Sequence, residues 1–334
     1  MVTREAAEVE IIRLLRAGLL GPDAEGYTSG QRLSDGLGIS RTAVWKHINS
    51  LKKMGFPIEA SPSKGYRLRS GKSPFNPVEV ASLLETGTIG RRIFFYPELA
   101  STNVKAFELG RGGEPEGTAV IADAQSRGKG RIGREWVSPP GVNLYTSIIL
   151  RPEILPRDAY NLTFLLAVSV AEAVSSLCAS GVTVKWPNDV LIGGRKAAGI
   201  LLEMDSEADR VYFVVAGVGV NLNMDKGMFP ARLRPLATSV AAGCGSDVDR
   251  AGFVRDLYSA LEKWYKVYLG DGFAPVLKAW KGYFASEGKP VKVVSFNRVV
   301  TGICLGVGDD GALLVRTPCG TVERVISGDV EPAG

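Results

Sequence analysis

A glycine-rich basic segment, Gln125-Ser-Arg-Gly-Lys-Gly-Arg-Ile-Gly-Arg-Glu-Trp136, lies in the first half of this 334-residue chain. Its glycines at 128, 130 and 133 fit the pattern G-x-G-x-x-G, which taken alone is a weak signal for dinucleotide binding. A Rossmann loop opens a helix, whereas here Pro139 and Pro140 follow too soon for a helix of useful length. The pattern therefore argues against a Rossmann fold.

The same segment alternates glycine with four cations, namely Arg127, Lys129, Arg131 and Arg134. A backbone cradle for pyrophosphate does not need these charges, but a flexible loop that wraps a phosphate ester uses them for charge-assisted hydrogen bonds. We predict such a loop, and a solvent-exposed basic turn is the alternative for this segment by itself. Because like charges repel, the loop is expected to be disordered without ligand.

Strand-like and helical patterns surround the loop. Apolar runs typical of strands occur at residues 93–96, 118–122, 144–150, 182–186 and 212–220, and helical patterns at 161–179 and 249–268. About 200 residues of this mixture can bury a large core. We predict one α/β domain over residues 78–285.

Three further segments of this region bring polar groups to strand ends. Ser101-Thr-Asn103 follows a strand and offers two hydroxyls and an amide, which suit a small polar head group. Lys185-Trp-Pro-Asn-Asp189 ends another strand with a cation and two polar side chains. In Arg195-Lys-Ala-Ala-Gly-Ile-Leu-Leu-Glu203, a turn and an apolar run hold Lys196 at the edge of a strand.

The N-terminal region reads as a separate helical module. An amphipathic helix is predicted over residues 6–20, ended by Gly21-Pro22. Ser29 can cap a short helix that breaks at Gly36 or Gly38, and Ser40 can cap a longer helix over residues 41–54 with Gly55 as its stop. Two short strands at 57–61 and 66–69 follow around a turn.

The third helix of this module has an apolar face and an opposing polar stripe. Val44, Ile48 and Leu51 form the apolar face. The polar stripe and the turn between the two strands supply hydrogen-bond donors and cations that can reach DNA bases and phosphates. The predicted DNA-binding residues are Arg41, Thr42, Lys46, Asn49, Lys53 and Lys64. A solvated charged helix face is the alternative. We expect His47 to pack or hydrogen-bond locally and to have no catalytic role.

The remaining parts are a linker and a C-terminal domain. Residues 70–77 are small, polar and proline-rich, as in an interdomain linker. Residues 286–334 show short strands separated by turns, which indicate a small barrel.

Composition and charge limit the class of protein. Hydrophobic residues at 45% and charged residues at 22% exclude disorder and collagen. Apolar runs are too short for a membrane helix and the N-terminus lacks a signal peptide, so we expect a cytoplasmic protein. Residues 31–69 hold eight basic and two acidic side chains, which indicates an anionic partner for this module.

The cysteines and the histidine exclude other chemistries. The four cysteines lie far apart without a C-x-x-C pair, so neither a disulfide scaffold nor a cysteine zinc site is expected; they are Cys178, Cys244, Cys304 and Cys319. The single histidine, His47, makes a Ser-His-Asp triad improbable.

Five motifs, in this order, resemble those of a biotin protein ligase. They are S-T-N at 101–103, Q-x-x-G-K-G-R-x-G-R-x-W at 125–136, K-W-P-N-D at 185–189, R-K-x-x-G-I-L-x-E at 195–203 and G-V-G-V-N at 217–221. With the winged helix before them, the chain resembles the bifunctional biotin protein ligase and biotin-operon repressor (BirA) family. The resemblance implies a multi-domain α+β fold: a winged helix-turn-helix (1–69), a linker (70–77), a central α/β domain with a class II synthetase-like mixed sheet (78–285) and an SH3-like β-barrel (286–334).

The resemblance also implies an ATP-dependent ligase acting on acetyl-CoA carboxylase. Such an enzyme joins biotin to ATP, forming biotinyl-5'-AMP, and passes biotin to a lysine of the biotin carboxyl carrier protein. The adenylate is also the corepressor, promoting a homodimer that binds operator DNA. Mg²⁺ would arrive with ATP, held by phosphate oxygens and water, without a dedicated protein metal site. No membrane partner is expected.

The resemblance implies residue roles as well. Those implied for biotin and the adenylate are Ser101, Thr102, Asn103, Gln125, Lys129, Gly130, Arg131 and Lys196, with Lys196 and Arg131 as the catalytic cations. Those implied for ATP are Arg134, Trp136, Lys185, Asn188, Asp189 and Asn221, with Trp136 stacking on adenine. Lys129 stands where the family often has arginine, which exchanges a bidentate fork for a point charge at a position that bears on retention of the adenylate.

Three alternatives stay open at this point. The first is a ligase whose N-terminal module has no regulatory role, and the second is a transcription factor that senses biotin without catalysis. The third is a lipoate ligase, which shares the central fold, although the G-K-G-R-x-G-R loop favours biotin.

Overall fold

The computed structural model describes residues 4–19, 26–71, 73–178, 181–295 and 298–332. Its contacts divide the chain into two compact units, Met1–Glu85 and Thr86–Gly334. None of the described helices is both long and apolar enough to cross a membrane.

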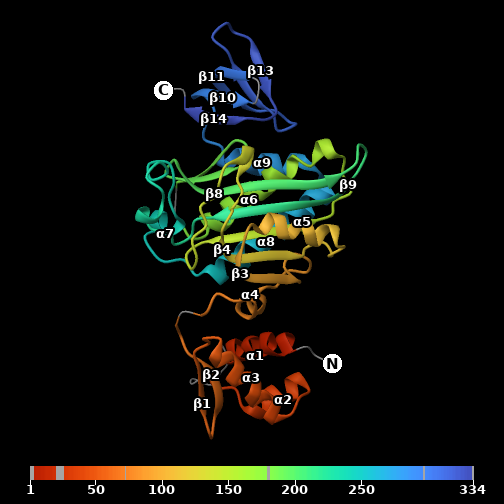
Figure 1. The fold of residues 1–334 in the computed structure, drawn as a ribbon, viewed down its shortest axis with the longest axis vertical. Helices are drawn as coiled ribbons and strands as arrows, with labels where there is room; N and C mark the ends of the chain where they lie inside the picture. Colours follow the sequence, from red (N-terminus) through yellow and green to blue (C-terminus); the bar gives the residue numbers. More distant parts are fainter. Residues whose placement is uncertain (1–3, 20–25, 72, 179–180, 296–297, 333–334) are drawn as a thin grey trace. The chain divides into compact units, whose positions relative to one another are not determined.

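The described residues of the first unit form four helices and a hairpin, in the order α1 (Arg4–Leu19), α2 (Gly30–Leu37), α3 (Arg41–Lys53), β1 (Ile58–Ser61), β2 (Gly65–Leu68) and α4 (Pro77–Leu83) (Figure 1). The predicted caps are confirmed: Ser29 accepts a hydrogen bond from the Arg32 amide, and Ser40 accepts one from the Ala43 amide. Gly38 ends α2 in the left-handed conformation, at φ 63°. The predicted Gly21-Pro22 stop lies outside the described residues.

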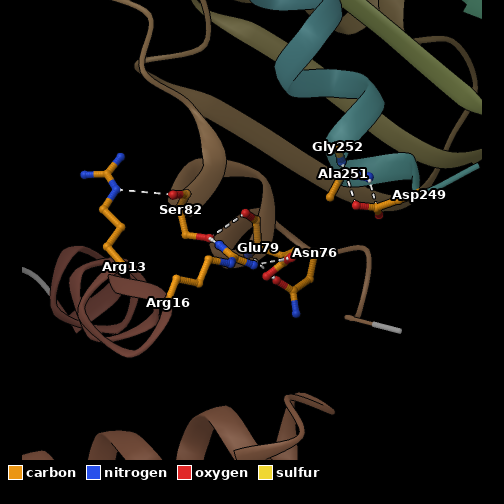
Figure 2. A network of polar contacts seen from close by, with 8 residues as sticks. All are labelled: Arg13, Arg16, Asn76, Glu79, Ser82, Asp249, Ala251 and Gly252. Carbon is orange, nitrogen blue, oxygen red and sulfur yellow. Dashed lines mark hydrogen bonds and ion pairs between the residues drawn. The ribbon is translucent and has the colours of Figure 1, made fainter. Parts of the chain in front are cut away.

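Helix α4 belongs to the first unit because it packs on α1. Asn76 caps α4 by accepting a hydrogen bond from the Glu79 amide, and Arg16 of α1 bonds the Glu79 carboxylate and the Ser82 hydroxyl (Figure 2). Arg13 donates to backbone oxygens at the end of α4, including that of Ala81 at 2.9 Å. The first unit therefore extends beyond the linker predicted at residues 70–77.

The second unit is built on a seven-stranded mixed sheet with the order β3-β4-β5-β9-β8-β7-β6. The strands are β3 (Ile93–Leu99), β4 (Ala119–Gln125), β5 (Leu144–Leu150), β6 (Val182–Lys185), β7 (Asp189–Ile192), β8 (Arg195–Ser206) and β9 (Val211–Val220). Only the β3–β4 pair is parallel among the described strands. All the strand-like runs predicted for the central domain fall on strands of this sheet.

Helices lie on both faces of this sheet (Figure 1). They are α5 (Thr102–Arg111), α6 (Asn161–Ser175), α7 (Val240–Cys244), α8 (Arg250–Asp271, capped by Asp249; Figure 2) and α9 (Phe273–Tyr283). Successive residues of a strand point to opposite faces. On β5, Thr146 bonds Tyr258 of α8, whereas Ser147 bonds Thr102 of α5. The α5 face is the one that carries the candidate site.

One disulfide corrects the expectation from cysteine spacing. Cys178, just after α6, bonds Cys244 at the end of α7, although 66 positions separate them in the sequence. Separation along the chain does not report distance in the fold, so two remote cysteines can still pair. Cys304 and Cys319 are free thiols.

The C-terminal residues of the second unit form a five-stranded antiparallel sheet with the order β13-β12-β11-β10-β14. Its strands are β10 (Pro290–Ser295), β11 (Arg298–Val307), β12 (Leu313–Arg316), β13 (Val322–Val325) and β14 (Asp329–Pro332). The buried Trp186 indole donates a hydrogen bond to the Gly311 carbonyl at 3.0 Å, which ties this sheet to the end of β6.

Candidate functional site

A cavity of about 780 Å³ opens on the α5 face of the second unit. It is lined by all fourteen residues that the sequence predicted for ligand binding there: Ser101, Thr102, Asn103, Gln125, Lys129, Gly130, Arg131, Arg134, Trp136, Lys185, Asn188, Asp189, Lys196 and Asn221. Segments 120 residues apart in the sequence thus meet around one space.

A buried polar corner forms one part of this cavity, at the N-terminus of α5. Gln125 accepts hydrogen bonds from the Thr102 amide at 2.8 Å and from its hydroxyl at 3.2 Å. Asn103 accepts one from Ser147 at 2.7 Å and donates one to Glu203 at 2.9 Å. These bonds fix the direction of each donor and acceptor, so the corner is organised before a ligand arrives. Ser147 and the role of Glu203 were not predicted.

Three glycines make the floor of the cavity on β8 and β9. A Cβ on Gly217 would lie 2.0 Å from the Asn103 amide oxygen, which is impossibly close. On Gly219 and Gly199 it would lie 2.6 and 2.9 Å from atoms of the Trp136 indole. The glycines of the G-V-G-V-N motif are therefore required because Asn103 and Trp136 lie directly on the strands.

Three of the four predicted loop cations are paired with carboxylates. Lys129 is 3.2 Å from Glu203, while Arg131 and Arg134 are 3.6 and 2.5 Å from Asp329 of β14. Arg131 also donates to the Asn188 side chain at 2.9 Å. The expectation that the loop repels itself left out these acids, which are remote in sequence. No signal in the sequence marked Asp329.

Lys196 lies against both the loop and the strands. Its ammonium is 2.7 Å from Asp189 and 5.3 Å from the centroid of the Trp136 ring. Its backbone is bridged to residues 236–238, because the Lys196 amide donates to the Leu236 carbonyl and the Thr238 amide donates to the Lys196 carbonyl. This backbone pairing and the ion pair together hold the ammonium at the cavity wall.

A second candidate site is a groove of about 720 Å³ in the first unit, between α3 and the hairpin. Of the residues predicted to bind DNA, Arg41, Thr42, Asn49 and Lys64 line it. Lys46 and Lys53 are exposed on α3 but are not among the lining residues. The sequence reading missed Trp45, which lines the groove with 57% of its surface exposed.

Part of the positive charge of this unit is neutralised. Hydrogen bonds from Arg69 and Arg67 lower the pKa of the Glu59 carboxyl to about 2. His47 lies 3.7 Å from the buried Glu8, which agrees with the local role predicted for it. Glu59 therefore neutralises part of the positive charge that the sequence count gave to this unit.

Three family models match consecutive parts of the chain. Residues 23–67 match a helix-turn-helix domain, residues 99–221 the biotin/lipoate A/B protein ligase family, and residues 288–331 the biotin protein ligase C-terminal domain.

Curated relatives match over most of the chain. The bifunctional ligase/repressor BirA of Bacillus subtilis is 39% identical over 305 residues, covering 91% of this chain and 94% of the relative. The BirA protein of Escherichia coli is 33% identical, covering 91% and 92%. Among solved structures, the biotin protein ligase of Aquifex aeolicus in complex with biotin and ATP superposes with a TM-score of 0.62 at 26% identity, covering 72% of this chain and 98% of that one.

Proposed function

This chain belongs to the family of bifunctional biotin ligase/repressor proteins, combining a biotin ligase with a helix-turn-helix DNA-binding module, and we propose how its residues carry out each activity. The observation that supports the assignment most is the single cavity, in which a buried polar corner adjoins a wall of cations. A small polar head group fits the first part, and phosphate fits the second.

In the first half-reaction, biotin and ATP form biotinyl-5'-AMP and diphosphate. The polar corner of Ser101, Thr102, Asn103 and Gln125 holds the biotin head group. A biotin carboxylate oxygen then attacks the α-phosphorus of ATP, and the bond from that phosphorus to the bridging oxygen breaks. Two anions must approach each other, so positive groups are needed where charge builds up. Lys196 and Arg131 supply them, while Lys129 and Gly130 close over the adenylate.

The nucleoside end of the adenylate occupies the other side of the cavity. Trp136 offers an aromatic face for adenine, and Arg134, Lys185, Asn188, Asp189 and Asn221 surround the ribose and phosphates. Mg²⁺ would enter with ATP and neutralise phosphate charge, and the oxygen donors of Asp189, Asn188 and Asp329 in the cavity wall suit such a hard cation.

In the second half-reaction, a lysine amine of the biotin carboxyl carrier protein of acetyl-CoA carboxylase attacks the biotinyl carbonyl and releases AMP. An amide forms and the mixed anhydride breaks, so no further co-reactant is needed. We expect the enzyme to act in the cytoplasm, where it would meet both the carrier protein and DNA.

The DNA-binding activity belongs to the groove of the first unit. Arg41, Thr42 and Asn49 face the groove from α3, and Lys64 from the hairpin, so a helix can enter the major groove of DNA while the hairpin contacts phosphate. We expect the adenylate-bound protein to form a homodimer that binds a two-fold operator as a repressor.

Ligation is tested with purified protein, biotin, MgATP and a carrier fragment of acetyl-CoA carboxylase. Mass spectrometry should show one biotinyl group on the fragment and none on a fragment whose acceptor lysine is arginine. Lipoate in place of biotin should leave the fragment unmodified. Absence of biotinylation, or equal modification with lipoate, would overturn the ligase assignment.

Regulation is tested by measuring binding to the protein's own upstream DNA at moderate salt. Biotin with ATP should tighten binding, and biotin or ATP alone should not. A ligase active on the carrier but indifferent to its ligands in this assay would have an N-terminal module without a regulatory role.

A further inference from the structure

One carboxylate on β8, that of Glu203, holds two parts of the ligand site at once. Its Oε2 atom accepts a hydrogen bond from the Asn103 amide at 2.9 Å, and its Oε1 atom lies 3.2 Å from the Lys129 ammonium. Asn103 belongs to the polar corner, and Lys129 belongs to the glycine-rich loop. Glu203 therefore connects the place proposed for the biotin head group with the loop proposed to close over the adenylate.

The contact with Glu203 determines how the Asn103 amide is oriented. The amide nitrogen donates to Glu203 and to the Leu201 carbonyl, the latter at 3.3 Å, while the amide oxygen accepts a hydrogen bond from Ser147 at 2.7 Å. An amide oxygen has two lone pairs, so one of them remains for a ligand. Asn103 is only 4% exposed, and in this buried corner it offers a ligand an acceptor and no donor. Such an acceptor suits an N–H group of a cyclic urea, which is the head group of biotin.

The contact with Lys129 uses the other oxygen of the same carboxylate. Glu203 lines a neighbouring space of about 650 Å³ on the loop, and it does not line the main cavity. Lys129 lines both spaces, and both side chains of the pair are partly exposed. An anion in the main cavity and the Glu203 carboxylate therefore compete for one ammonium group.

We propose that Glu203 is a positioning residue with two separable roles, and the proposal rests on the proposed ligase function. Through Asn103 it fixes the biotin pocket as a hydrogen-bond acceptor. Through Lys129 it competes with the adenylate and so shortens the time for which this intermediate is retained. Glu203 does not need to touch the ligand for either role.

The second role predicts a gain of binding when the charge is removed. The ion pair between Lys129 and Glu203 has to open before the ammonium can contact the adenylate, and the negative charge of Glu203 repels the phosphate. Loss of this charge, with the acceptor for Asn103 kept, should therefore slow the release of the adenylate.

Glu203→Gln and Glu203→Ala separate the two roles. Glutamine keeps an oxygen that can accept from Asn103 but has no charge to hold Lys129, whereas alanine keeps neither. In biotin-dependent ATP–diphosphate exchange, the KM for biotin should rise about tenfold in Glu203→Ala and stay within about twofold of the parent value in Glu203→Gln. Dissociation of radiolabelled biotinyl-5'-AMP into an excess of unlabelled adenylate should be about three- to fivefold slower in Glu203→Gln.

A double-mutant cycle tests whether the slower release depends on Lys129. In a Lys129→Gln background, Glu203→Gln should change the dissociation rate by less than about twofold, because no ammonium remains to be shared. An equally large decrease in that background would show that the charge of Glu203 acts without Lys129, and this would overturn the second role.

Asp205→Asn is the matched control. Asp205 also lies on β8, its side chain is 30% exposed against 32% for Glu203, and it pairs with Arg111 of α5 at 3.3 Å without lining either cavity. This variant should behave as the parent in both assays. An unchanged KM for biotin in Glu203→Ala would overturn the first role, and unchanged or faster release in Glu203→Gln would overturn the second. If the parent protein itself shows no exchange, the proposed ligase function fails instead.

Discussion

At the scale of single residues, the site depends on the positions of individual charged groups and on close packing that leaves no room for one extra carbon atom. The Lys196 ammonium forms an ion pair with Asp189 and lies 5.3 Å from the centroid of the Trp136 ring. Gly217 has no room for even a methyl group beside Asn103. Both residues allow direct tests.

Lys196→Ala should abolish adenylate formation while the fold stays intact. Removing a preorganised cation from the position where charge develops typically costs 10²- to 10³-fold in kcat. Biotin-dependent ATP–diphosphate exchange measures this step, and circular dichroism with DNA binding checks the fold. Near-normal exchange in the variant would refute the role of Lys196.

Gly217→Ala should weaken biotin binding, because a Cβ there would lie 2.0 Å from the Asn103 oxygen and must displace that side chain. Overpacking of this kind typically costs 1–3 kcal/mol, so the KM for biotin should rise roughly tenfold or more. Gly227→Ala is the control, since a Cβ there meets nothing within 4 Å. Equal KM values in the two variants would contradict the packing argument.

At the scale of elements, we expect α3 and the hairpin to contact different parts of DNA, α3 the bases and the hairpin the phosphates. Trp45 is a large apolar side chain exposed in the groove, suited to the methyl groups of thymine, whereas Lys64 at the hairpin turn is suited to phosphate.

This division predicts two kinds of loss. Trp45→Ala should weaken specific binding about tenfold and leave the slope of log K against log salt unchanged. Lys64→Ala should reduce that slope by about 0.9, because one phosphate contact is lost. Titrations at several salt concentrations separate the two cases. A changed slope in the Trp45→Ala variant would contradict this division, because it would mean that removing the indole also removes a phosphate contact.

Helix α8 holds the start of the second unit through one buried carboxylate. Glu262 accepts hydrogen bonds from the amides of Gly87, Thr88 and Ile89. Burial alone would raise the pKa of the Glu262 carboxyl, but Lys266 and these amides lower it to about 2.

The pKa of Glu262 is lower in the folded state than its ordinary value of 4.5, so its ionised carboxylate stabilises the fold at pH values above 4.5. This stabilisation is lost as the pH falls toward 2. At pH 7, Glu262→Gln should therefore reduce the free energy of unfolding of the second unit by about 1–3 kcal/mol. The difference from the parent should shrink between pH 5 and pH 3. Chemical denaturation at several pH values measures it, and a constant difference would contradict the assignment.

At the scale of the whole molecule, short sequence motifs predicted the features that depend on residues close together in the chain. The caps at Ser29 and Ser40 follow from short stretches of sequence. The polar groups that line the cavity belong to short motifs, and the family resemblance of those motifs implied their common site. The partners that complete these features come from remote segments. Asp329, Glu203 and the Cys178–Cys244 bond become neighbours of their partners only through the sheet topology, which no short pattern encodes.

The internal pairing of the loop cations has a consequence for how the two activities respond to ionic strength. Binding of DNA releases condensed ions into solution, so rising salt opposes it strongly. In the proposed mechanism the adenylate takes the place of Glu203 and Asp329 as the partner of Lys129, Arg131 and Arg134. Because these carboxylates already neutralise the cations, few dissolved ions are released on binding, and we expect retention of the adenylate to change little with salt. Between low and moderate potassium chloride, operator occupancy should fall while the adenylate dissociation rate stays nearly constant. Ionic strength would then determine which of the two activities operates. At moderate salt the protein would still ligate biotin but would no longer repress.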